Sequence, residues 1–181
     1  MKIRYNAPVV LTYALLALIC LLLPVSQTLG ISLSSPAKLA FSDPRFYLRL
    51  FSYVFAHAHW SHYMGNMMVI LLVGPLLEEK YRSGKLLEMM LVTAAATGLV
   101  NAALFGDHLI GGSGLAFMMV LLSSFSNFRA REIPLTFILV AVIFIGSEVV
   151  DILKIDRVSQ FSHLAGGLIG ALYGFARGGR G

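Results

Sequence analysis

Six apolar runs alternate with short polar stretches along the chain. They cover residues 8–28, 61–78, 86–105, 113–128, 134–151 and 162–176. A helix needs about 20 apolar residues to cross the hydrocarbon core of a bilayer, and most of these runs approach that length. Lipid offers no partner to an unpaired backbone group, so each run should be helical. The pattern predicts an all-α, polytopic membrane protein in which residues 1–181 form one domain, a bundle of six transmembrane helices.

The composition agrees with a membrane protein. Hydrophobic residues make up 57% of the chain and charged residues 13%, and the mean hydropathy is +0.80, far from the balance of soluble domains. The first run follows a basic start, but no small-x-small cleavage pattern comes after it, so we expect an uncleaved first helix. The net charge of +5 does not indicate nucleic-acid binding, because no basic cluster interleaves with aromatic residues.

The positive charges indicate the topology. Nine of the 14 Lys and Arg residues fall on one side of the predicted bundle, namely Lys2, Arg4, Lys80, Arg82, Lys85, Arg129, Arg131, Arg177 and Arg180. The others fall on the opposite side. Because Lys and Arg concentrate in cytoplasmic loops, both termini are expected in the cytoplasm.

The fourth run is short. Residues 113–128 give a helix of about 24 Å, against roughly 30 Å of hydrocarbon. Arg129 and Arg131 fix its cytoplasmic end, so Ser113 at its other end should lie below the outer membrane surface. The preceding residues 109–112 would then be irregular backbone at membrane depth, which is tolerated only within protein or beside a water-filled cavity. The sequence therefore predicts Ser113 at the floor of a wet cavity.

Three sets of polar residues remain inside the runs, where polar groups are functional candidates by default. Ser113 stands in the cluster Gly111-Gly112-Ser113-Gly114. His62 and Asn66 are four residues apart in the second run, so they share one helix face. His163 lies at the start of the sixth run.

A glycine ridge lies beside His163. Gly166, Gly170 and Gly174 recur every four residues, and such small-residue faces let two helices approach closely. His163 comes three residues before Gly166, near the same face. If the fourth helix packs on this ridge, His163 meets Ser113.

Each feature also has a plainer interpretation. A Gly-Gly-Ser-Gly cluster is most often a turn, and a histidine at a helix end is usually an interfacial residue with satisfied hydrogen bonds. A glycine ridge is usually a packing surface, and Asn66 could be a strut between helices. The joint order favours a functional interpretation: a His/Asn pair, then a serine at a helix start, then a histidine on a glycine face, all toward one side of the membrane.

These residues resemble the motifs of rhomboid intramembrane serine proteases of the minimal six-helix bacterial type. His62 and Asn66 match the family's H-x-x-x-N, and residues 111–114 match its G-x-S-G. The sixth run matches H-x-x-G-x-x-x-G from His163 onward. The resemblance covers nearly the whole chain and implies a multi-pass protein of the bacterial inner membrane.

The resemblance also implies roles for these residues. Ser113 would be the nucleophile, and His163 the general base and then the general acid. The side chains of His62 and Asn66 and the backbone N–H of Ser113 would surround the oxyanion. The family cuts peptide bonds in or near transmembrane helices without a metal or cofactor, so the expected partners are transmembrane protein substrates and the lipid bilayer.

The chemistry of the residues supports these roles independently. Serine is a poor nucleophile until a base removes its proton, and imidazole suits that task near neutral pH. A helix start offers exposed N–H groups and a positive dipole end where negative charge develops. Gly111, Gly112 and Gly114 let a substrate backbone approach closely.

The chain departs from the commonest family pattern at several positions. Phe117 stands where many members have Tyr, and it can pack under the His163 ring but cannot donate a hydrogen bond. Residues 47–49 replace a frequent Trp-Arg pair, and Ser162 replaces an Ala. None of these changes removes a catalytic group. No carboxylate is obviously placed to orient His163, so a dyad is the default.

Other functions compete with proteolysis. Within the family, the alternative is a catalytically inactive relative that binds transmembrane clients, although retention of Ser113 and His163 argues against it. A metalloprotease or metal transporter would draw on His57, His59, His62 and His163. The sequence contains no H-E-x-x-H and no carboxylate cluster in the runs, so no metal site is expected. A channel or transporter is disfavoured because no inverted repeat and no ring of charges occurs.

Overall fold

The computed structural model describes residues 6–125, 142 and 157–178. Its elements are α1 (Pro8–Leu22), α2 (Val25–Leu29), α3 (Pro44–Ser52), the 3-10 helix η1 (Tyr53–Phe55), α4 (Trp60–Tyr81), α5 (Ser83–Leu104), α6 (Ser113–Phe125) and α8 (Arg157–Gly178). No strand occurs in this described part of the chain, so the all-α prediction is confirmed there. The predicted helix at 134–151 lies outside the described residues.

Two of the described helices, α4 and α5, are long and apolar enough to cross a membrane. The other apolar helices are shorter: Pro8–Leu22, Ser113–Ser123 and Leu164–Gly174. The count of six spans is therefore not confirmed by these residues, although the helical character of five predicted runs is.

The boundaries of the predicted helices differ from the observed ones at both ends of the chain. The first run, predicted as one helix over 8–28, divides into α1 and α2, because Pro24 has no N–H to continue the helix. In the last helix, α8 begins at Arg157, five residues before the predicted start. The helix after the glycine cluster begins at Ser113, as predicted.

Two elements in the long connection before α4 were not predicted. Asp43 caps α3 by accepting a hydrogen bond from Arg45 N (2.9 Å), and Pro44 takes the first helical position. This is ordinary start chemistry for a helix. Phe46 and Leu50 of α3 are buried against Ala102 of α5, so this part of the connection packs against the bundle.

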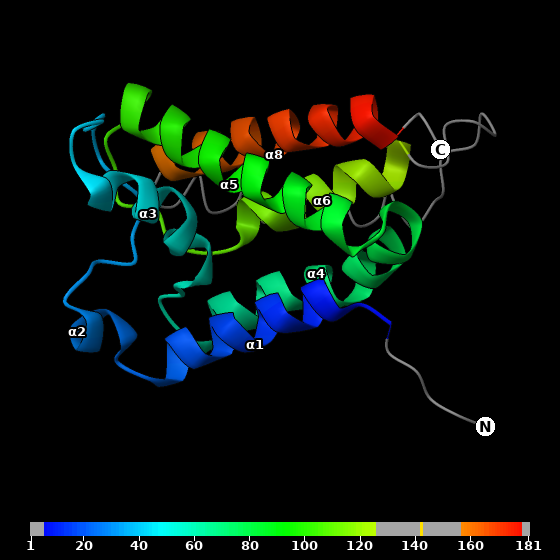
Figure 1. The fold of residues 1–181 in the computed structure, drawn as a ribbon, viewed down its shortest axis with the longest axis horizontal. Helices are drawn as coiled ribbons and strands as arrows, with labels where there is room; N and C mark the ends of the chain where they lie inside the picture. The colour runs from blue at the N-terminus through cyan, green and yellow to red at the C-terminus, as the bar shows by residue number, and fades with distance from the viewer. Residues whose placement is uncertain (1–5, 126–141, 143–156, 179–181) are drawn as a thin grey trace.

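α6 is the central helix of the described fold. It packs against α4 on one side and against α5 and α8 on the other, and Figure 1 shows it between the α1–α4 pair and the α5–α8 pair. All residues from Ser113 to Val120 are buried. The predicted central helix that begins at Ser113 is present, and its first residue is buried like its middle.

Glu78 joins the ends of three helices. Its side chain is 2% exposed, and its two oxygens accept hydrogen bonds from the first backbone N–H groups of α1, at Val9 (2.9 Å) and Val10 (3.0 Å). Ser83 Oγ, at the start of α5, donates to the same carboxylate over 2.6 Å. A carboxylate suits this place because the N-terminus of a helix has unpaired donors and a positive dipole end.

Candidate functional site

Ser113 occupies the first position of α6, directly after an irregular segment. Gly112 O accepts the first helical bond, from Ala116 N at 2.9 Å. Just before it, Gly111 has a φ of +111°, a conformation that an L side chain rarely adopts. The glycine at 111 therefore permits the turn that directs the chain into α6. Ser113 is 5% exposed.

Gly111 lies directly against the two polar side chains of α4. A Cβ built on Gly111 would lie 2.6 Å from His62 Nε2 and 3.4 Å from Asn66 Nδ2. Its N–H donates to Tyr53 O over 3.0 Å. The structure thus brings the predicted His/Asn pair to the backbone of Gly111, two residues before Ser113. No side chain would fit between this backbone and His62.

His57 is a part of this cluster whose role the sequence did not reveal. Asn66 Nδ2 donates to His57 Nε2 over 3.1 Å, and His57 Nδ1 lies 3.2 Å from Phe55 O. The carbonyl can only accept, so the proton is on Nδ1 and the lone pair is on Nε2. The sequence could not predict this contact. His57 lies before the start of α4 and Asn66 lies within it, so their spacing of nine residues does not fix the distance between the two side chains.

The surroundings of His57 keep its ring neutral. Burial lowers the pKa of His57 to about 4, and the neighbouring His62 ring, whose centroid is 5.0 Å away, acts in the same direction. The hydrogen bond to the Phe55 carbonyl raises the pKa, but by less than burial and the His62 ring lower it. A neutral ring is what the hydrogen bond from Asn66 requires, because only an unprotonated Nε2 can accept.

α8 carries His163, but the side chain of His163 lies outside what the structure describes. One turn further along α8, Gly167 packs against α6: a Cβ there would lie 2.6 Å from Phe117 Cδ1 and 3.0 Å from Gly114 O. Phe117 thus sits against the α8 backbone four residues from His163. Its predicted packing under the His163 ring stays a prediction.

The glycine ridge of α8 packs mainly on α5. The partner suggested by the sequence was the fourth predicted helix, which is α6. A Cβ on Gly166 would collide with Thr97 of α5, and one on Gly170 would collide with Thr93. Gly174 lies against both Leu122 of α6 and Met89 of α5. The ridge faces mainly α5, and Gly167, which lies beside the ridge, brings α8 to the start of α6. Neither threonine was a candidate, since neither stands out in an apolar run.

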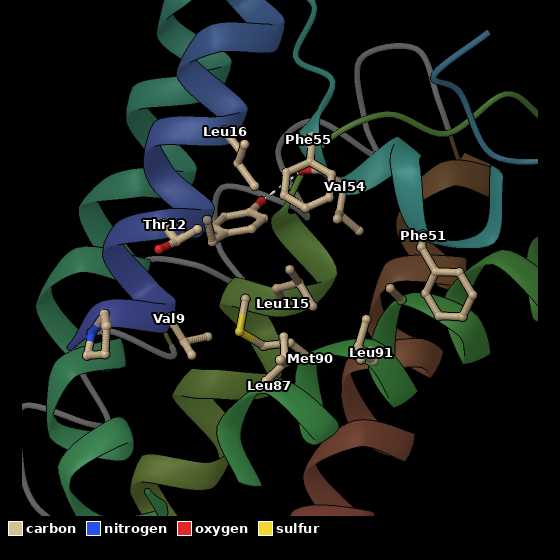
Figure 2. Close-up of a pocket in the computed structure, with 13 residues that line it drawn as sticks. Val9, Thr12, Leu16, Phe51, Val54, Phe55, Leu87, Met90, Leu91 and Leu115 are labelled. Carbon is tan, nitrogen blue, oxygen red and sulfur yellow. Dashed lines mark hydrogen bonds between the residues drawn. The ribbon is translucent and has the colours of Figure 1, made fainter. Parts of the chain in front are cut away.

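Two cavities border this region. One of about 280 Å³ lies between α1 and α5, where Val9, Thr12 and Leu16 face Leu87 and Leu91 (Figure 2). Its walls are almost entirely apolar, and the polar side chains among them are the hydroxyls of Thr12 and of Tyr13, which donates to Val54 O.

The other cavity, of about 510 Å³, is open and partly polar. It reaches His57 and Ile110, which lie next to the candidate site, and it is also lined by Cys20, Ser26, Gln27, Gly30, Ile31, Ser32, Leu33, Ser34 and Ala56. The placement of Ser113 at the floor of a wet cavity stays a prediction. Within residues 6–125 and 157–178, no three His, Cys, Asp or Glu residues are grouped to hold a metal ion.

Comparison with known proteins identifies the family. The Rhomboid domain profile matches residues 44–180, a span that contains all three motifs around residues 62–66, 111–114 and 163–170. The chain therefore belongs to the rhomboid family. Members of this family are embedded in membranes and are generally serine proteases, and the two long apolar helices agree with a membrane location.

Two relatives show how far the similarity extends. The chain is 27% identical to rhomboid-related protein 1 of Caenorhabditis elegans over 138 residues, which is 70% of this chain but 39% of the nematode protein. It is 23% identical to rhomboid protease GlpG of Haemophilus influenzae over 178 residues, which is 89% of this chain and 88% of that protein. The chain thus spans well under half of the first relative and most of the second.

Proposed function

We propose that the protein is an intramembrane serine endopeptidase that cleaves transmembrane segments of membrane proteins. One observation carries the proposal: helices α4 and α8 both meet the chain within two residues of Ser113. His62 and Asn66 lie against Gly111, and Gly167 lies against the carbonyl oxygen of Gly114. Three motifs that are far apart in the sequence thus converge on one serine.

The finer architecture is part of the same proposal. The chain crosses the membrane six times, with both termini in the cytoplasm of a bacterial cell. The excess of Lys and Arg on one side supports this orientation. The similarity to a bacterial rhomboid protease over 89% of the chain supports the bacterial and proteolytic parts of the proposal.

Catalysis would proceed through an acyl-enzyme. The imidazole of His163 takes the hydroxyl proton of Ser113 as its oxygen attacks the carbonyl carbon of the scissile peptide bond. When the tetrahedral intermediate collapses, the C–N bond breaks and His163 returns the proton to the leaving amine. A water molecule, activated by the same imidazole, then hydrolyses the ester.

The hydrogen bonds of Asn66 support the proposed oxyanion site. A side-chain amide carries two N–H groups on Nδ2, and one of them donates to His57 Nε2. Among the described residues no acceptor is recorded for the second, and we assign it to the oxyanion, together with the N–H of Ser113 and the Nε2 of His62. Such donors are most effective when they are held in place before the reaction, because they then need no reorganisation.

Cleavage of a model transmembrane substrate tests the proposal. Purified protein in liposomes, together with Ser113→Ala and His163→Ala variants, is incubated with the substrate and the fragments are followed by gel and mass spectrometry. We expect cleavage by the wild type, none by either variant, and no effect of chelators. Undiminished cleavage by either variant overturns the dyad. Stable binding of the substrate with no cleavage by any form supports instead an inactive, client-binding relative.

A further inference from the structure

The irregular segment that leads into α6 is held by one buried serine. Ser35 is 0% exposed. Its backbone N–H donates to Leu109 O over 2.9 Å, and its Oγ accepts from Leu109 N, also over 2.9 Å. One residue of the long connection therefore satisfies both backbone groups of Leu109, as a neighbouring strand would.

The hydroxyl of Ser35 also links this segment to α5. Asn101 Nδ2 donates to Ser35 Oγ over 3.2 Å and to Asp107 O over 2.6 Å. The hydroxyl itself donates to Asp107 O, at 3.4 Å. Ser35 Oγ thus accepts two hydrogen bonds and donates one, which is the full capacity of a hydroxyl.

The next fixed point along the chain is Gly111. Its N–H binds Tyr53 O, and its backbone lies against His62 Nε2 and Asn66 Nδ2. Leu109 and Gly111 are therefore the last two positions pinned from outside before the first helical bond of α6 forms at Gly112. An error in the position of Leu109 is passed on to Gly111, and from there to the distance between Ser113 and the two side chains of α4.

We propose that Ser35 is a positioning residue, which sets the place of Ser113 and its backbone N–H relative to His62 and Asn66 by fixing Leu109. The proposal rests on the proposed serine catalysis. Ser35 touches neither substrate nor reacting atoms, and it acts on Leu109 through one backbone–backbone bond and one bond to its hydroxyl. A displacement of about 1 Å at a reacting group can reduce the rate a hundredfold, so the loss of one anchor has a measurable effect on turnover.

The test compares Ser35→Ala with Ser35→Thr, which keeps the hydroxyl, and with Ser34→Ala as the matched control. Ser34 is the preceding residue and its hydroxyl binds Arg49, Ser32 and the His108 side chain, not the backbone of Leu109. For each variant, kcat and KM are measured with the transmembrane substrate well below the unfolding temperature. Backbone amide hydrogen exchange is followed over residues 107–112.

We expect Ser35→Ala to lower kcat by roughly ten- to a hundredfold with KM nearly unchanged, and to speed exchange at Leu109. Ser35→Thr restores most of kcat, and Ser34→Ala keeps wild-type values. A purely structural role would lower the unfolding temperature of Ser35→Ala but leave kcat of the folded protein intact, and that result overturns the proposal.

Hydrogen exchange separates this proposal from the proposed function. If the wild type does not cleave, the proposed function fails, and exchange still decides whether Ser35 holds the segment. Exchange at Leu109 that is the same in Ser35→Ala and the wild type overturns the role of Ser35, whatever the activity.

Discussion

Asn66 Nδ2 donates a hydrogen bond to His57 Nε2, with 3.1 Å between the two atoms. The bond fixes the rotation of the Asn66 amide, because His57 is itself held by the carbonyl of Phe55. A side chain whose orientation is fixed in advance presents its remaining N–H in one direction only. His57 is therefore expected to act on the oxyanion through Asn66, although it does not touch the substrate.

Replacing His57 should impair turnover more than binding. We expect His57→Ala to lower kcat about tenfold with little change in KM, because Asn66 remains but is free to rotate. Asn66→Ala should cost more, about 2.7–4 kcal/mol of barrier, as other oxyanion donors do. Glu79→Ala, at an exposed residue of the helix that carries Asn66, serves as the control. A His57→Ala variant with wild-type kcat would show that Asn66 needs no such support.

The stability of the protein should depend on pH through His57. Its pKa is about 4 when folded and about 6.5 when unfolded, so between these values the unfolded chain binds more protons. The contribution of His57 to the free energy of unfolding is therefore fully present above about pH 6.5 and is lost as the pH falls toward 4. Unfolding temperatures measured in detergent across this range should show a shallower dependence in His57→Gln than in the wild type. Equal slopes would contradict the burial of a neutral ring.

Substitution of two glycines should distinguish close packing from open space. Gly111→Ala places a methyl group on His62 Nε2 in a backbone conformation that favours glycine, so activity should be abolished. Gly65→Ala adds a methyl group in the same helix as His62, where nothing lies within 4 Å. It should keep activity and stabilise α4 by roughly 0.5–1 kcal/mol. An active Gly111→Ala variant would refute the tight contact between this backbone and α4.

Replacing the buried Glu78 should destabilise the protein more than replacing an exposed residue of α4. Glu78→Ala leaves two N–H groups of α1 and the Ser83 hydroxyl without their acceptor, so a loss of about 2–4 kcal/mol in the free energy of unfolding is expected. The neighbouring Glu79 is exposed, and Glu79→Ala should stay within about 0.5 kcal/mol. Reversible unfolding in mixed micelles measures both. Equal stability of the two variants would mean that water replaces the carboxylate at α1.

The sequence predicted the parts of this structure that depend on local pattern. Apolar runs gave α4, α5 and the start of α6 at Ser113 closely, because helix formation in lipid depends on the chain's own hydrogen bonds. α3 was missed because it is too short and too mixed in polarity to form an apolar run of membrane-spanning length, and its burial depends on Ala102 of α5, which is far away in the sequence.

The contacts of the site were predictable only in part. Spacing placed His62 and Asn66 on one face of a helix, and the structure brings that face to Gly111. The bonds of His57 and Ser35 come from loops, whose geometry is set by several partners at once. The partner of the glycine ridge was not predictable either, because Thr93 and Thr97 look like ordinary packing residues until α5 and α8 are placed together.

The central claim is that Ser113 is an activated nucleophile, and covalent labelling measures this most directly. Wild-type protein in liposomes is treated with a fluorophosphonate, and the modified residue is located by mass spectrometry. We expect one adduct, on Ser113, whose formation slows by orders of magnitude in His163→Ala. Cleavage of substrate by a protein that carries no adduct on Ser113, or an adduct that forms equally fast without His163, would contradict the account.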